Sequence, residues 1–119
     1  ADTAFNDYDD GAGNATVNNA LITLNGHDRF DRREGTYFSH VQRHQHHSGS
    51  SDLGHIYVYS FALNPEEHQP SGTCNFSRID TARLETTTAM NASNDHLIYA
   101  VNYNVLRIMS GMGGLAYSN

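Results

Sequence analysis

Residues 55–80 read HIYVYSFALNPEEHQPSGTCNFSRID, and this stretch indicates the fold class of the whole chain. Its first part, 56–63, alternates large and small side chains and contains neither Gly nor Pro. Alternate residues of a strand point to opposite faces, so one face here would carry the large side chains. That face consists of Tyr57, Tyr59, Phe61 and Leu63. The pattern predicts a strand that is covered on both faces.

Pro65 and Pro70, the only two prolines, bracket the acidic segment that follows this strand. Proline fixes φ and lacks the N–H that a sheet needs, so the segment is predicted to be a rigid turn between strands. A second alternating run at 72–79 predicts the next strand, and one of its faces would carry Cys74, Phe76 and Arg78. The central unit is therefore expected to be strand, stiff corner, strand.

The composition supports an all-β protein. The chain has 119 residues, which is room for one small domain or for part of a larger one. It contains seven Tyr, five Phe and ten Gly but no Trp, and the hydrophobic share is 38%. Aromatic residues favour strands, and the small apolar share allows a sheet layer but not a large core.

The composition argues against nucleic-acid binding, a membrane span and an intrachain disulfide. The net charge is −6 and all seven basic residues are Arg, whereas a general nucleic-acid binder needs clustered cations. Four of the arginines lie within 29–43, interleaved with acidic residues, which predicts a solvated or ion-paired loop. No apolar run approaches the length of a membrane span. The single Cys74 cannot form an intrachain disulfide and is expected to pack as a small hydrophobic residue.

The flanking segments fit the same architecture. Residues 1–18 are polar and predict a flexible or loop segment, which leaves 19–119 as the folded portion. Residues 20–24 predict a short strand that ends at the turn pair Asn25-Gly26. Phe30 is expected to plug the following polar loop onto the body, and 35–47 predict a turn or two of helix.

Later segments predict further strands. Residues 82–88 predict a strand with Leu84 pointing inward, and 90–95 a turn. Residues 96–109 predict the longest strand, interrupted by a glycine-rich bulge or turn at 110–114 and followed by a last fragment at 115–117. Long strands without helical crossovers indicate antiparallel sheets, most simply a sandwich of Greek-key or jelly-roll type.

Three long strings carry a resemblance to a known family: LNGHDRF (24–30), SFALNPEEHQPSGTCNFSRID (60–80) and IYAVNYNVLRIMSGMGGLAYSN (98–119). They closely resemble the C-terminal part of the major capsid protein of nucleo-cytoplasmic large DNA viruses, of the mimivirus and phycodnavirus kind. The resemblance covers most of residues 20–119.

The resemblance implies a double jelly roll, of which this chain would be the C-terminal portion of the second roll. It also implies homotrimeric, pseudo-hexagonal capsomers that contact neighbouring capsomers and minor capsid proteins in an icosahedral virion, assembled in the host cytoplasm. The implied role is structural, with no enzyme activity, cofactor, small-molecule substrate, membrane span or direct contact with nucleic acid. A partial jelly roll leaves strand edges and an apolar face uncovered, so we expect the isolated piece not to be stable by itself.

The residues expected to matter are therefore packing residues. Tyr57, Tyr59, Phe61, Tyr99 and Tyr103 are expected to anchor the stacked sheets, Pro65 and Pro70 to set the corner, and Phe76 to pack beside them. Arg78 and Asp80 would share a strand face and pair with neighbours. Arg107, on an otherwise apolar strand, would require a carboxylate from a buried contact or an interface.

One alternative comes from a different class of function. His40, His44 and His46 lie at spacings that could gather imidazoles, so a jelly-roll module could use the loop His40–His47 to bind a metal or a carbohydrate. No HExxH motif is present, and the flexible sequence that follows offers no rigid support. Adjacent Glu66 and Glu67 are expected to be solvated or paired with Arg rather than catalytic.

Overall fold

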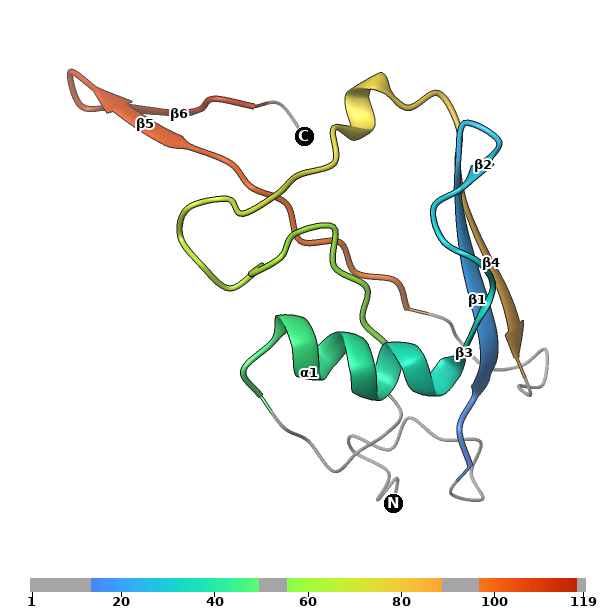
Figure 1. The fold of residues 1–119 in the computed structure, drawn as a ribbon. Coiled ribbons are helices and arrows are strands. Elements are labelled where there is room, and N and C mark those ends of the chain that lie inside the picture. The colour runs from blue at the N-terminus through green and yellow to red at the C-terminus, as the bar shows by residue number, and fades with distance from the viewer. Residues whose placement is uncertain (1–13, 50–55, 89–96, 118–119) are drawn as a thin grey trace, which may run out of the picture.

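The computed structural model describes residues 14–49, 56–88 and 97–117 (Figure 1). The predictions for 1–18 and 90–95 lie wholly or partly outside these residues. The described strands are β1 (Val17–Leu24), β2 (His27–Asp28), β3 (Arg33–Glu34), β4 (Ala82–Thr88), β5 (Leu106–Met109) and β6 (Met112–Leu115). The helical elements are the π-helix η1 (Tyr37–Val41), the α-helix α1 (Gln42–His46) and the 3₁₀-helix η2 (Phe76–Arg78).

Strand β1 organises the main sheet. It pairs antiparallel with β4 from Val17 opposite Thr88 to Leu24 opposite Ala82. The short strands β2 and β3 pair with the other edge of β1. The predicted strands at 20–24 and 82–88 are therefore confirmed, and β1 begins two residues before the boundary expected at 19. The side chain of Leu84, however, is 47% exposed in the described chain, so its predicted inward orientation is wrong here.

A two-residue turn connects β1 to β2, as the sequence predicts. Asn25 and Gly26 have φ values of 52° and 81°. Positive φ at both central positions is the geometry that joins twisted antiparallel strands tightly, and Asn-Gly adopts it readily. The side chain of Asn25 also accepts hydrogen bonds from the backbone N–H groups of Asp80 and Thr81, at 2.9 and 3.2 Å. This turn therefore fixes the start of β4 as well.

The predicted helix at 35–47 is confirmed, and residues 37–41 within it have π geometry. Figure 1 shows it crossing beside the lower end of the main sheet. Phe38, with Ala20 and Leu21 of β1, makes up the buried apolar core of the described residues. Gly35 lies so close to β1 that a Cβ atom there would collide with the carbonyl oxygen of Val17. The position of the helix against β1 therefore depends on the absence of a side chain at Gly35 as well as on the burial of Phe38.

The strand predicted at 56–63 is absent from the described chain, where this segment is irregular. Its backbone is bound by the helix instead, because Val58 N–H donates to the carbonyl of Phe38 at 3.2 Å. Ser60 then bonds locally, donating from Oγ to the Ala62 carbonyl and accepting from the Ala62 N–H. Local bonds of this kind compete with a sheet ladder. The alternating sequence therefore did not identify a neighbouring strand.

The strand predicted at 72–79 is also wrong. Asn75 Oδ1 accepts a hydrogen bond from Ser77 N–H at 3.1 Å and caps the short helix η2. An asparagine side chain that bonds two residues ahead favours a turn over a strand. Consequently Arg78 lies on η2 and does not share a strand face with Asp80. Cys74 is half-buried in an irregular segment rather than mid-strand.

Of the long strand predicted at 96–109, the described residues form a strand only at the end, as β5. Ser110 and Gly111, with φ values of 52° and 75°, make a tight turn into β6, which therefore begins earlier than the last fragment predicted at 115–117. Figure 1 shows the β5–β6 hairpin extending away from the main sheet. Among the described residues no helix is long and apolar enough to span a membrane.

Candidate functional site

A continuous series of aromatic contacts joins the helix to the central stretch. Phe30 packs against Phe38 and Tyr59, with ring centroids 5.6 and 4.9 Å apart. Tyr59 in turn contacts Phe61 at 5.0 Å, and Phe61 contacts Phe76 at 5.5 Å. These separations lie in the favourable range for tilted and edge-to-face pairs. The prediction that Phe30 plugs its loop onto the body is confirmed.

The two tyrosines of the central stretch have different environments: the Tyr57 hydroxyl forms a hydrogen bond, and Tyr59 is partly buried. Tyr57 Oη accepts a hydrogen bond from the backbone N–H of Val17 at 3.2 Å and so ties the stretch to β1. Partial burial raises the pKa of the Tyr59 hydroxyl, an effect that nearby Arg29 partly opposes. These aromatic residues therefore connect a loop, a helix and a strand, whereas they were expected to pack between two sheets. They are Tyr57, Tyr59, Phe61 and Phe76.

Gln42 is a buried residue whose structural importance sequence reasoning missed. Its Nε2 donates to the Tyr37 hydroxyl at 2.8 Å, and its Oε1 accepts the Ser60 N–H at 3.4 Å. Buried amides are tolerated when both ends are bonded, as they are here. The sequence did contain a signal for this role. Gln42 lies one turn after Phe38 and therefore on the same, buried face of the helix.

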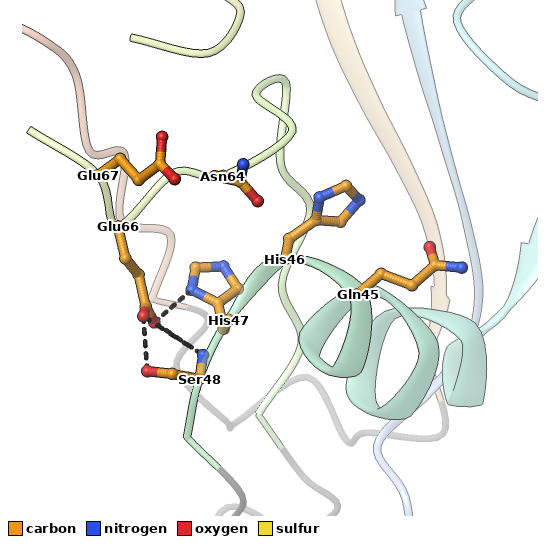
Figure 2. Close-up of a pocket in the computed structure, with 7 residues that line it drawn as sticks. All are labelled: Gln45, His46, His47, Ser48, Asn64, Glu66 and Glu67. Atoms are coloured by element: carbon orange, nitrogen blue, oxygen red, sulfur yellow. Dashed lines mark hydrogen bonds and ion pairs between the residues drawn. The ribbon is translucent and has the colours of Figure 1, made fainter. Parts of the chain in front are cut away.

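The acidic corner between Pro65 and Pro70 is joined to the end of α1, as Figure 2 shows. Glu67 N–H donates to the Asn64 carbonyl at 3.3 Å, so the predicted turn is confirmed. The Glu66 carboxylate accepts hydrogen bonds from Ser48 Oγ at 2.6 Å and from the Ser48 N–H at 3.2 and 3.3 Å. It also lies 3.2 Å from His47 Nδ1. We refer to Glu66, His47 and Ser48 as the clasp.

The electrostatics of the clasp follow from these bonds. The hydrogen bonds from Ser48 and the nearby His47 hold the pKa of Glu66 below its ordinary value. Glu66 is therefore paired with His47 and Ser48, whereas a solvated carboxylate or a pair with Arg was expected. An open hollow of about 300 Å³ lies beside the clasp, lined by backbone and side chains of Gln45, His46, His47, Ser48, Asn64, Glu66 and Glu67.

The three candidate metal-binding histidines do not gather. His40 Nδ1 bonds to Ser39 Oγ at 2.7 Å, whereas His46 Nδ1 donates to the Leu63 carbonyl at 2.7 Å. His44 is exposed on α1. Within the described residues, no group of three or more His, Cys, Asp or Glu side chains could hold a metal ion.

The segment 97–117 presents an exposed apolar surface. Tyr99 is 83% exposed and Tyr103 46% exposed, so neither covers a sheet within the described chain. Arg107 on β5 is also exposed, and no carboxylate of the described residues forms an ion pair with it. The apolar members of this surface are Leu97, Ile98, Tyr99, Val101, Tyr103, Val105, Leu106, Ile108, Met109, Met112, Leu115 and Tyr117. We call this set the apolar arm.

Comparison with known proteins identifies relatives over nearly the whole chain. The model of the large eukaryotic DNA virus major capsid protein family matches residues 2–114. The chain is 64% identical over 106 residues to the major capsid protein of Phaeocystis pouchetii virus, which covers 84% of this chain and 20% of that protein. It is 50% identical over 128 residues to the major capsid protein of Paramecium bursaria Chlorella virus 1, covering 88% of this chain and 29% of the relative.

The fold agrees with these relatives. A quasi-atomic model of the PBCV-1 virus capsid matches with a TM-score of 0.67 and 43% identity, over 94% of this chain and 32% of that chain. The match confirms the predicted fold class, an all-β antiparallel jelly roll of the double jelly-roll type. The chain spans about a fifth to a third of the length of these relatives. It belongs to the family of large eukaryotic DNA virus major capsid proteins.

Proposed function

We propose that this chain is the C-terminal portion of the second jelly roll of a major capsid protein, and that its function is structural. The whole protein would form homotrimeric, pseudo-hexagonal capsomers in the icosahedral shell of a large DNA virus. Family membership and the matched capsid fold support this proposal. Virion assembly in the host cytoplasm, with contacts to neighbouring capsomers and minor capsid proteins, belongs to the same proposal.

The observation that carries the proposal is the apolar arm. Val101 is 99% exposed and Ile98 76% exposed, and the exposed apolar residues of this set extend into the hairpin β5–β6. Large contiguous apolar surfaces mark sites where another protein surface binds. The radius of gyration, 17.2 Å, also exceeds the roughly 13.5 Å expected for a compact chain of this length. The chain thus has the extended shape and uncovered surface of one part of a larger assembly.

In the whole capsid protein, the remaining strands would cover the apolar arm and give Arg107 a carboxylate partner. Obligate assemblies bury large apolar areas in this way. Tyr99 and Tyr103 would then become the sheet-stacking anchors that their alternation predicts. By the same reasoning, the 119-residue chain alone should lack a cooperative, monomeric thermal transition.

The test uses the full-length capsid protein and electron microscopy of the purified product. Val101→Asp places a charge at the most exposed apolar position of the arm, and it should abolish trimeric capsomers because a carboxylate would be buried without a partner. His44→Asp, at an exposed position on α1, is the matched control and should still give capsomers. Capsomers of normal yield from Val101→Asp would refute the claim that the arm is covered.

A further inference from the structure

Asn104 is the least exposed residue of the C-terminal part of the described chain. Every residue from 97 to 117 is exposed except Asn104, which is half-buried. Asparagine ordinarily lies at the surface, yet the apolar side chains on either side of it, Tyr103 and Val105, are more exposed than it is. A polar side chain that is covered while its apolar neighbours are not must be explained by its hydrogen bonds.

The Asn104 side chain bonds to the main chain at the open end of the β5–β6 hairpin. Its Oδ1 accepts the Tyr117 N–H at 3.1 Å, and its Nδ2 donates to the Tyr117 carbonyl at 3.0 Å. Leu106 pairs with Leu115, so Asn104 and Tyr117 lie opposite each other two residues beyond the last pair of the hairpin. A carboxamide carries the donor and acceptor of a peptide group, so this side chain bonds both backbone groups of Tyr117 as a partner strand would.

The same side chain also ends the ladder between β5 and β6. The Ala116 N–H donates to the Val105 carbonyl at 2.9 Å, but the Val105 N–H donates to Asn104 Oδ1 at 2.8 Å. In a continuing antiparallel ladder, the Val105 N–H would instead donate to the Ala116 carbonyl. A side chain that accepts a neighbouring backbone N–H competes with strand pairing. This competition accounts for the start of β5 at Leu106, although the alternating sequence predicted a strand from 96.

We propose that Asn104 is a positioning residue that stops the β5–β6 ladder at Val105 and holds the main chain at Tyr117. The chain before β5 and the chain after β6 diverge at this end of the hairpin (Figure 1), and the two bonds to Tyr117 fix where they part. The inference deepens the proposed structural function and rests on it, because these directions matter where the hairpin meets the rest of the capsid protein. The hydrogen bonds themselves lie within the chain and do not depend on what covers the apolar arm.

Hydrogen exchange of the full-length capsid protein, read by mass spectrometry at single residues, tests this role. Asn104→Leu removes both the donor and the acceptors at nearly constant size. Protection of the Tyr117 amide should fall about two- to tenfold, as for the loss of one ordinary hydrogen bond. Protection of the Val105 amide should be kept, because the Ala116 carbonyl becomes available as its acceptor. Gln45→Leu, which removes an exposed carboxamide from α1, is the matched control and should change neither amide.

The outcomes separate a local role from a general one. A fall at Tyr117 with Val105 protection kept supports the proposal. Unchanged Tyr117 protection overturns it, and a fall at both amides overturns the claim that Asn104 stops the ladder. Equal losses throughout β1 would show that Asn104 supports the whole fold, and would also overturn the proposal. Exchange is measurable whether or not capsomers form, so a failure here is distinct from a failure of the proposed function.

An electron-microscopy map of the full-length protein at side-chain resolution tests the same role without a substitution. The Asn104 amide should lie within about 3.2 Å of both backbone groups of Tyr117. A map in which β5 and β6 remain paired before Val105, with the Asn104 side chain turned away from Tyr117, would refute the proposal.

Discussion

Residues 56–61 (IYVYSF) and 97–103 (LIYAVNY) have nearly the same pattern but different environments. The first is half-buried, with Tyr59 packed on Phe30 and Phe61. The second leaves Tyr99 83% exposed. The two differ because the helix lies beside the first segment, whereas no described element covers the second. An alternating aromatic sequence thus does not determine by itself whether its rings are buried, because that depends on which other elements pack against it.

The largest expected effect comes from removing an aromatic ring, and it should differ between the two regions. Phe38→Ala should lower the opening free energy of the β1 amides by about 3 kcal/mol, because a 4% exposed ring that contacts Phe30 and Tyr59 is removed. Tyr99→Ala should change the same amides by less than about 0.5 kcal/mol. Native-state hydrogen exchange measures both, since it reports local opening even without a cooperative transition. Equal effects would mean that the two regions do not differ as described.

Glycine substitutions sharpen the same comparison. Gly35→Ala should destabilise β1 by about 1–3 kcal/mol, because the new methyl group would collide with the Val17 carbonyl oxygen. Gly113→Ala in β6 should be nearly neutral, since nothing lies within 4 Å of the position of its Cβ. Hydrogen exchange of the β1 and β6 amides, respectively, tests each change. A neutral Gly35→Ala would contradict the close approach of the helix to β1.

A smaller effect is expected at the surface ion pair. Arg32 donates to Glu85 at 2.9 Å and to Asn19 Oδ1 at 2.8 Å, and the two charged side chains are about 40% exposed. Arg32→Ala should cost about 0.2–1 kcal/mol at low salt, and the cost should shrink in concentrated salt. Arg107→Ala, on the arm, should show no such salt dependence in the 119-residue chain. Exchange of the β4 amides at two salt concentrations provides the measurement.

The smallest expected effect concerns the clasp and pH. Because the folded pKa of Glu66 is lowered, the clasp contributes its full stability above the ordinary value of 4.5 and loses it as pH falls through the lower folded value. The protection factor of the Ser48 amide, which corrects for the intrinsic pH dependence of exchange, should therefore fall in that acidic window, and Glu66→Gln should remove most of this change. Glu67→Gln removes a charge from the same corner and should preserve it. An unchanged acid response in Glu66→Gln would contradict the clasp.

The sequence predicted those elements whose determinants are local. Asn25-Gly26 predicted the tight turn because Asn and Gly tolerate positive φ, and the helix at 35–47 followed from its apolar spacing. The strands predicted at 56–63 and 72–79 failed because a strand requires a partner, and alternation does not identify one. Asn75 also bonded to its own backbone and replaced extended structure by η2.

The candidate site shows the same division. That Pro65 and Pro70 enclose a turn could be predicted, since proline restricts the backbone wherever it occurs. The clasp could not, because Ser48 and Glu66 are 18 positions apart and meet only when α1 and the corner are in place. Gln42 was missed for the same reason, since its value depends on the distant Ser60 N–H.

By itself, the sequence determined the family, the all-β fold class, the Asn25-Gly26 turn and the strands at 20–24 and 82–88. These follow from long matching strings and from backbone preferences that act over a few residues. Only the tertiary structure decided which aromatic rings are covered, because burial depends on contacts between segments far apart in the chain. Tyr59 and Tyr99 have the same intrinsic chemistry, and the surrounding structure alone makes one a packing residue and the other part of an exposed surface.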